Sequence, residues 1–245
     1  MEPPPFEVRL ELVGWELFWA RLTLPDEADT AKDEDRTADL AALRVAVTDW
    51  ARAELKLATL SSHPTLAVLR SLFKTAGCDP TRYRASSESL LRRILKGEDL
   101  PAVHPLVDLA NCLSATLLVP CSVAVVDTFE PPVVLRAGRD GESYPSFRGP
   151  LKLDGKPLLA DARGPFDSPI TSSRRTGVRP DTRRVWLVAY LPARVVLPDD
   201  ARRTLRDLVS AAPVATLESP SVSSFPSPLG PLSLPHSTPS QGEGE

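Results

Sequence analysis

The sequence lacks several features that would assign it to a class at once. It contains no run of about 20 apolar residues, which excludes a membrane-spanning helix. Only three cysteines occur, at Cys78, Cys112 and Cys121, and this odd, scattered set predicts a reducing compartment without a disulfide framework. Charged residues from Glu2 to Glu11 stand where a secretory signal peptide would be apolar. We therefore expect a cytoplasmic protein with no membrane partner.

Phosphate-loop and metal chemistry are also missing from the chain. Gly149 and Gly155 are separated by five residues, where the phosphate loop of nucleotide-binding proteins has four. Pro157 replaces the Ser or Thr that would hold magnesium, and no GxGxxG occurs. A structural zinc site needs four Cys or His ligands at short paired spacings, which the sequence does not offer. We expect neither a metal nor a cofactor.

Nucleophile-based hydrolase signatures are weak. No GxSxG turn occurs, and the two histidines outside the C-terminal segment, His63 and His104, each precede a proline at a predicted helix start. That position favours helix capping or core packing over catalysis. Cys121 follows Pro120 at the beginning of a predicted strand, but no basic signature lies beside it to activate a thiolate. A structural role is favoured for this cysteine as well.

Charge is segregated along the chain, although the net charge is only −3. Residues 1–60 hold 13 acidic and 7 basic side chains, whereas residues 61–212 hold 16 acidic and 22 basic ones. Arginine outnumbers lysine by 23 to 6. An arginine-rich, moderately basic body fits a phosphate-bearing partner. It equally fits the arginine-rich codon usage of a GC-rich genome, so composition leaves both explanations open.

Periodicity predicts an α+β chain arranged around residues 86–127. Within this stretch we expect a helix capped by Ser86 and stopped at Gly97, a helix starting at Pro105, and a valine-rich strand over residues 122–126. The pattern further predicts strands over 6–12, 15–24, 157–161 and 185–190, and a hairpin that pairs 133–136 with 142–147. It predicts helices over 40–57, 64–77 and 199–211. The remaining segments are predicted as loops over 25–36 and 164–181 and as a disordered Ser/Pro-rich tail over 213–245.

The helix that starts at Pro105 carries two stripes. Apolar residues at helical spacing predict a buried face, while Asp108, Asn111 and Ser114 recur at every third position on another face. This polar stripe has two interpretations: a solvated or backbone-bonding face, or a pocket wall that presents hydrogen-bonding groups to a ligand. Periodicity alone does not choose between them.

Residues 164–182 combine several Ser and Thr hydroxyls with Arg174, Arg175 and Arg179, directly before a predicted core strand. One interpretation is a solvated loop whose hydroxyls form local backbone turns. The other is a ligand loop that offers hydroxyls and guanidinium groups to a carbonyl, a ribose or phosphates. Loops anchored on a rigid element often carry function.

The segments 82–120 (RYRASSESLLRRILKGEDLPAVHPLVDLANCLSATLLVP) and 160–192 (ADARGPFDSPITSSRRTGVRPDTRRVWLVAYLP) resemble the free-standing B3/4 domain proteins. These are similar to the editing module of the phenylalanyl-tRNA synthetase β subunit, and the resemblance covers residues 63–192. It implies a single α+β domain over residues 1–212, with a central mixed or antiparallel sheet packed with helices and a pocket between the two. In the synthetase that pocket hydrolyses the ester of a tRNA carrying the wrong amino acid. The resemblance thus implies the aminoacylated end of tRNA as partner, and no DNA.

Matching positions of the two segments also imply a set of pocket residues. Asn111, Ser173 and Thr176 would orient the ester and a water molecule, and Arg175 would hold the terminal ribose-phosphate. An aminoacyl ester is already activated, so a pocket that positions water and stabilises the oxyanion can suffice. The remaining residues implied to contact the substrate are Asp108, Ser114, Ser168 and Thr171.

Three positions depart from the family pattern. Ser172 stands where relatives usually have aspartate, Ser122 where the synthetase module has histidine, and His104 where many relatives have asparagine. These departures bear on catalysis rather than on the fold. They keep open a non-catalytic binder of tRNA or of an amino acid, and also an interaction module that uses the C-terminal tail. The identity of the amino acid and the oligomeric state do not follow from the sequence.

Overall fold

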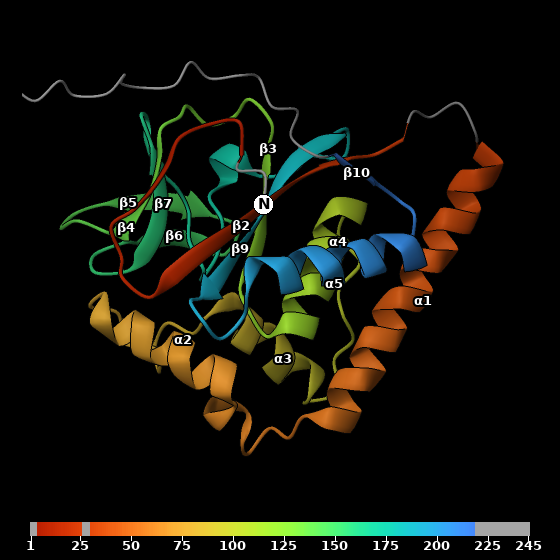
Figure 1. Ribbon diagram of the computed structural model, residues 1–245, viewed down its shortest axis with the longest axis horizontal. Helices are drawn as coiled ribbons and strands as arrows, with labels where there is room; N and C mark the ends of the chain where they lie inside the picture. Colours follow the sequence, from red (N-terminus) through yellow and green to blue (C-terminus); the bar gives the residue numbers. More distant parts are fainter. Residues whose placement is uncertain (1–3, 26–29, 219–245) are drawn as a thin grey trace, which may run out of the picture.

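The computed structural model describes residues 4–25 and 30–218, and its helices and strands confirm the predicted α+β class (Figure 1). The helices are α1 (Thr30–Glu54), α2 (Pro64–Thr75), α3 (Ser86–Ile94), α4 (Pro105–Leu117) and α5 (Pro198–Ala211). The strands are β1 (Val8–Leu10), β2 (Trp15–Thr23), β3 (Cys121–Val125), β4 (Val133–Ala137), β5 (Ser143–Ser146), β6 (Gly149–Lys152), β7 (Pro157–Asp161), β8 (Gly164–Asp167), β9 (Arg184–Pro192) and β10 (Thr216–Glu218).

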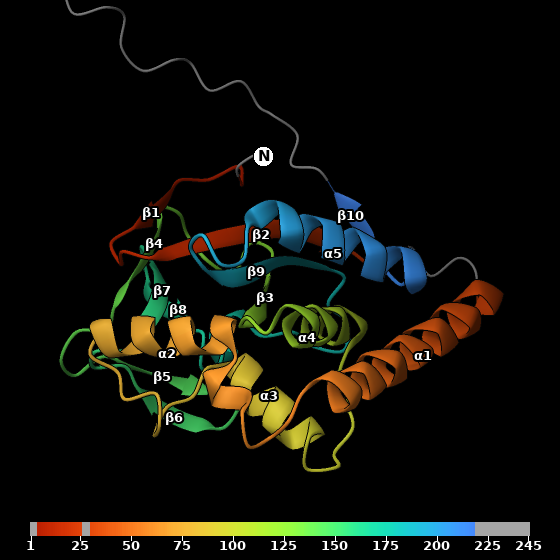
Figure 2. The same ribbon diagram turned by 60° about the horizontal axis from the view of Figure 1, so that its bottom comes forward.

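The strands form two four-stranded sheets and a hairpin. The first sheet, in the order β10-β2-β9-β3, is antiparallel throughout. The second, β1-β4-β7-β8, contains one parallel pair, β1 with β4. Strands β5 and β6 pair with each other. Figures 1 and 2 show the second sheet and this hairpin at one end of the molecule and α1 at the other, so the expected central sheet is divided in two.

Helix α4 packs between α1 and β3 (Figure 2). Its apolar face is buried as predicted, with Leu106, Leu109 and Leu113 all inaccessible to solvent. Pro105 occupies the first helical turn, where a missing N–H costs nothing. His104 is the N-cap and its Nδ1 accepts the Leu106 N–H. The helix therefore begins where the sequence predicts.

Helix α3 differs from the prediction at its first residue. Ala85, not Ser86, is the N-cap, and no side chain caps this helix. The Ser86 N–H instead donates to the Pro169 carbonyl, 2.8 Å away. A tertiary contact thus replaces the expected local cap and ties α3 to the loop after β8. At the other end Gly97 adopts the left-handed conformation (φ +100°) after α3, which agrees with the predicted stop.

The predicted hairpin between 133–136 and 142–147 is wrong. Strand β4 lies between β1 and β7, where Val133 and Leu135 are fully buried, and β5 turns back on β6 instead. The turn between β5 and β6 is closed by Gly149, whose φ of +103° favours glycine. Because β4 has a neighbouring strand on each side, it buries more apolar surface than it would in a two-stranded hairpin.

Other boundaries also shift. Helix α1 occupies residues 30–36 of the predicted loop and ends at Glu54, three residues early. Residues 164–167 of the other predicted loop form β8. The expected tail begins too early, because β10 pairs with β2 and Val214 and Ala215 are buried; the rest of it lies outside the described residues. Among the residues described, no helix is long and apolar enough to cross a bilayer.

Candidate functional site

A cavity of about 420 Å³ lies between α3, α4, β3 and the segment 170–178, and we call it the interlayer cavity. Most of its wall is apolar. The polar part of the wall consists of Ser86, Arg93, Asn111, Ser114, Cys121, Ser122, Arg148, Thr171 and Ser172. The rest of the wall consists of Leu90, Pro101, Val103, Val107, Ala110, Val123, Phe147, Ile170, Gly177 and Val178. Ligand pockets typically combine an apolar wall with a few polar groups, at volumes of roughly 300–1,000 Å³.

The polar stripe of α4 divides between the two interpretations. Asp108 is buried and accepts the Val103 N–H at 2.9 Å, while its other oxygen pairs with Arg44 at 2.6 Å. This side chain therefore holds the start of α4. Asn111 and Ser114 do face the cavity. The Ser114 hydroxyl donates to the Val119 carbonyl, whereas the half-buried Asn111 amide makes no hydrogen bond with any residue of the described chain.

The predicted hydroxyls of the loop after β8 mostly turn inward. Ser168 donates to the Thr171 carbonyl, and its oxygen accepts two backbone N–H groups, which makes a local turn. Ser173 caps the short 3₁₀ helix at residues 174–176 by accepting the Arg175 N–H. Thr176 is fully buried and donates to the Phe166 carbonyl. Of these predicted residues only Thr171 lines the cavity, beside Ser172.

Arg175 lies outside the interlayer cavity and is held by the protein itself. Its two Nη groups bind both oxygens of Asp161, at 3.0 and 2.9 Å. They also donate to the carbonyls of Thr128 (3.3 Å) and Gly164 (3.1 Å). All four Nη–H donors are thereby used, and only the Nε–H remains. The guanidinium also lies over the Phe166 ring, 5.7 Å from its centroid, so this arginine joins β7 and β8 to the loop.

Sequence reasoning missed a buried acid behind the cavity. Asp167, at the end of β8, is 2 % exposed, and its Oδ2 accepts hydrogen bonds from the Ser122 hydroxyl on β3 and from the Tyr190 hydroxyl on β9, the latter at 2.5 Å. Burial raises the pKa of the Asp167 carboxyl, and these two hydroxyls oppose the rise, with Ser172 close by acting in the same direction. The available signal was an acidic residue directly after an apolar stretch at 164–166.

Neither the cavity cysteine nor the helix-start histidines offer a reactive group. Burial raises the pKa of the Cys121 thiol far above its usual value, so the thiolate is not formed. Burial lowers the pKa of His104, whose ring is used in the cap described above. His63 is likewise the N-cap residue of α2, though without a side-chain hydrogen bond. The described residues contain no group of three His, Cys, Asp or Glu side chains able to hold a metal.

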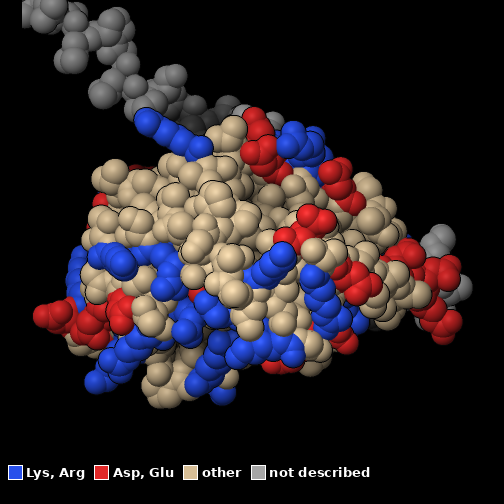
Figure 3. Space-filling model, turned by 90° about the horizontal axis from the view of Figure 1, so that it is seen from below, with Lys and Arg blue, Asp and Glu red and all other residues tan. Residues whose placement is uncertain are grey.

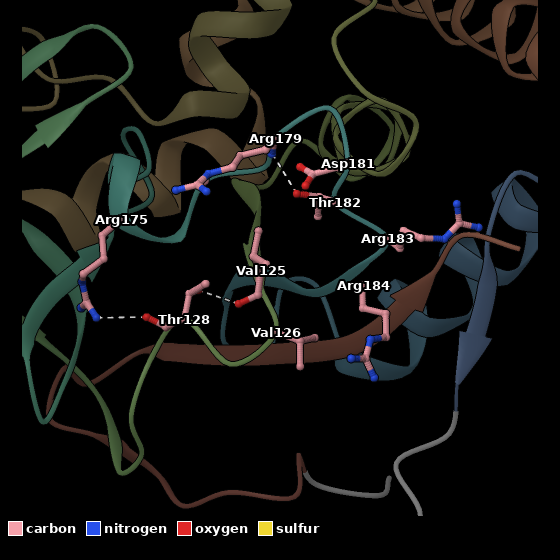
Figure 4. A pocket seen from close by; sticks show the side chains of 10 residues that line it. Val125, Val126, Thr128, Arg175, Arg179, Asp181, Thr182, Arg183 and Arg184 are labelled. Atoms are coloured by element: carbon pink, nitrogen blue, oxygen red, sulfur yellow. Dashed lines mark hydrogen bonds between the residues drawn. The ribbon is translucent and has the colours of Figure 1, made fainter. Parts of the chain in front are cut away.

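A second concavity adjoins the first and is basic; we call it the arginine cleft (Figure 4). Its volume is about 510 Å³, and it shares Gly177 with the interlayer cavity. Arg179 and Arg184 are exposed there, and their guanidinium groups make no hydrogen bond or ion pair with any residue of the described chain. Its full lining is Val125, Val126, Thr128, Arg175, Gly177, Arg179, Asp181, Thr182, Arg183 and Arg184.

Basic side chains also gather on the outer surface. Figure 3 shows Lys and Arg crowded in the lower half of the face seen from below, where few acidic side chains interrupt them. Two arginines that line the rim of the interlayer cavity, Arg93 and Arg148, are exposed. Fields of one sign attract a ligand of the opposite charge, so this surface favours an anionic partner.

Residues 69–208 match the B3/4 domain family, which is more than half of the chain. The chain belongs to the B3/4 domain family. The match includes almost every element that builds the two concavities, from α2 to α5. Among curated proteins, none matches this sequence.

One solved structure similar to this B3/4 domain protein is the crystal structure of an N-terminal fragment of the phenylalanyl-tRNA synthetase β-subunit from Pyrococcus horikoshii. The two share 12 % sequence identity at a TM-score of 0.39, over 89 % of this chain and 53 % of that fragment. This chain thus spans about half the length of the fragment. At such a TM-score the likeness carries no argument about the site, and the family assignment rests on the sequence match.

Proposed function

We propose that this B3/4 domain protein hydrolyses the ester bond between an amino acid and its tRNA. The observation that carries the proposal is an apolar-walled cavity, with amide and hydroxyl groups on one side, that adjoins a basic cleft in which Arg179 and Arg184 make no hydrogen bond or ion pair with the described chain. The cavity is large enough to take an aminoacyl group, and the arginine cleft offers guanidinium groups to phosphates of the tRNA. A tRNA substrate also supports the cytoplasmic location expected from the sequence.

The cavity wall supports a division of labour. Apolar residues such as Val107 and Ile170 would surround the amino-acid side chain. The Asn111 amide, with no partner of its own, would donate to the ester carbonyl oxygen, where negative charge develops during hydrolysis. Of the eight residues implied by the family resemblance, we carry forward Asn111, Ser114 and Thr171 as direct substrate contacts. We propose that Asp108, Ser168, Ser173, Arg175 and Thr176 act by holding the walls.

The proposal predicts rapid, selective loss of the amino acid from one mischarged tRNA. Purified protein is mixed with a panel of correctly and wrongly acylated tRNAs, and ester loss is followed at neutral pH. Asn111→Ala should lower the rate constant about 100-fold, as expected for the loss of one oxyanion donor. Thr116→Ala, on the same helix but outside the cavity lining, is the matched control and should keep the wild-type rate.

Two outcomes would count against this function. If the wild-type protein binds tRNA and hydrolyses none of the panel, the cavity belongs to a binding module. If Asn111→Ala deacylates as fast as Thr116→Ala, the amide has no part in the reaction. Capture of a free amino acid without turnover would place the protein in the binding class as well.

The arginine cleft carries a separate prediction about affinity. Each cation that contacts a phosphate releases counterions, so its removal lowers the slope of log K against log salt by about 1. Arg179→Ala combined with Arg184→Ala should therefore weaken tRNA binding and lower this slope by about 2. The matched control is the pair Arg203→Ala and Arg206→Ala, two exposed arginines of α5 outside the cleft. Equal slopes for both double variants would exclude the cleft as a phosphate contact.

A further inference from the structure

The floor of the interlayer cavity contains a hydroxyl with an acid behind it. Ser122 lies on β3, is half-buried and lines the cavity. Its hydroxyl donates to Asp167 Oδ2, which belongs to β8 in the other sheet. A hydroxyl whose proton is directed at a carboxylate turns its lone pairs the other way. Those lone pairs are therefore available to a group bound in the cavity.

The acid itself does not reach the cavity. Asp167 is 2 % exposed and does not line the wall, so a ligand contacts Ser122 and not the carboxylate. Oδ2 accepts from both Ser122 and Tyr190, while Oδ1 is buried and makes no hydrogen bond with the described chain. A buried carboxylate with one unsatisfied oxygen is costly, and such groups in folded proteins call for an explanation. A structural tie to Tyr190 alone would not require a second donor that faces a cavity.

Asp167 supplies a carboxylate near position 172, where the family pattern has an aspartate and this chain has a serine. Ser172 occupies the position where related proteins usually carry an aspartate, and Ser172 lies close to Asp167. The family resemblance of the sequence implies that Ser122 stands where the synthetase module has histidine. This chain therefore lacks both groups at their usual positions, yet brings a carboxylate and a hydroxyl together at the same place.

We propose that Ser122 is the nucleophile of the cavity and that Asp167 is its general base, an inference that rests on the proposed ester hydrolysis. In the first step Ser122 Oγ bonds to the ester carbonyl carbon while its proton passes to Asp167 Oδ2. The bond from that carbon to the ribose oxygen breaks, and this oxygen takes a proton from a water molecule in the cavity, which leaves a hydroxide ion there. A hydroxyl activated by an adjacent base is the usual form of such catalysis.

The second step releases the amino acid. The hydroxide ion attacks the acyl-serine, and Ser122 Oγ leaves and takes back the proton that Asp167 Oδ2 has held since the first step. The free amino acid and the original dyad result, so no oxidant, metal or further reactant is needed. Burial, by raising the pKa of Asp167, makes the ionised carboxylate a stronger base than an exposed aspartate. Tyr190 keeps its proton, because burial and the neighbouring carboxylate raise its pKa well above the usual value.

Two variants and a control test the dyad on the full chain. Ser122→Ala should lower the deacylation rate constant at least about 10³-fold, and Asp167→Asn, which keeps the shape of the side chain, about 10²-fold or more. Thr116→Ala is the control. It removes a hydroxyl of α4 that donates to the Cys112 carbonyl outside the cavity lining, and it should stay within about threefold of the wild type. Thermal unfolding of each variant separates loss of the dyad from loss of the fold.

Covalent trapping distinguishes a nucleophile from a residue that positions water. Diisopropyl fluorophosphate should form a bond from phosphorus to Ser122 Oγ with release of fluoride. Mass spectrometry should then locate the adduct on the peptide that contains this residue, and Asp167→Asn should slow its formation about 100-fold. Acid quench during turnover should also leave the amino acid on Ser122. Deacylation by Ser122→Ala at half the wild-type rate or more would overturn the dyad but leave the proposed function standing. A wild-type protein that deacylates nothing would overturn both.

Discussion

Arg175→Ala is expected to lower the free energy of unfolding by about 3–5 kcal/mol, because it leaves a buried carboxylate without its partner. The Asp161 side chain is fully inaccessible, and both of its oxygens bind the Arg175 guanidinium. The Thr128 and Gly164 carbonyls lose their donor in the same variant. Urea denaturation at neutral pH measures the effect. The variant therefore reports on folding before it reports on any substrate contact.

The loss of unfolding free energy caused by Arg175→Ala should be smaller at low pH, and this pH dependence tests the prediction a second time. Burial raises the pKa of Asp161, but the hydrogen bonds from Arg175 and the Glu130 N–H outweigh it, so the folded pKa lies below its usual value. The stabilisation by this pair is complete above the unfolded pKa of about 3.9 and is lost as pH falls through the folded pKa. The wild type and Arg175→Ala should therefore converge in stability as pH drops below about 4.

A surface arginine supplies the control for this experiment. Arg163 approaches Glu130 at 3.8 Å, with half or more of each side chain exposed. Arg163→Ala should change the free energy of unfolding by no more than about 0.5 kcal/mol, because exposed ion pairs contribute little. Equal stability of Arg175→Ala and Arg163→Ala at neutral pH would contradict the role given to Arg175.

Asp108→Ala is expected to cost about 2–4 kcal/mol, the sum of a lost helix-start acceptor and a broken ion pair. Asp108 Oδ1 accepts the Val103 and His104 N–H groups before α4, and Oδ2 pairs with Arg44. Asp108→Asn keeps an oxygen for the two N–H groups and removes only the charge, so it should cost about half as much. Thermal or urea denaturation of the three proteins measures the difference.

Asp108 also provides a check on the boundary of the site. Because its carboxylate is used by the fold, Asp108→Ala that remains folded should keep kcat/KM for deacylation within about threefold of the wild type. A tenfold loss in folded protein would return Asp108 to the substrate contacts implied by the family resemblance. Asp99→Ala is the stability control, since that side chain is 81 % exposed although it pairs with Arg52.

Elements whose signals are local could be predicted from the sequence. The apolar spacing of α4 predicted its buried face, Gly97 predicted the end of α3, and the continuous apolar run of β9 predicted a buried strand. The segments 82–120 and 160–192 were enough to suggest the family that the match to residues 69–208 establishes. Each of these signals depends on residues within a few positions of one another.

Partners that are distant in sequence could not be predicted. The hairpin expected around Gly141 does not form, because β4 pairs with β1 and β7 instead. Ser86 is not the expected N-cap, and its N–H donates to the Pro169 carbonyl. Among the candidate site residues, Ser173 and Thr176 were implied by the family resemblance. In the structure their hydroxyls make hydrogen bonds within the protein, to the Arg175 N–H and the Phe166 carbonyl. Loop hydroxyls satisfy whichever buried backbone group lies nearest, and only the packed fold decides which one that is.

By itself the sequence determined the α+β class, the family, the buried face of α4 and the presence of Asn111 and Ser114 on one of its sides. These follow from helical and strand periodicity and from segments that can be read along the chain. Only the tertiary structure decided that Arg175 belongs to Asp161 and that Ser122 meets Asp167 across 45 residues. The reason is physical: a charge taken out of water needs a partner, and that partner is chosen by which elements pack together.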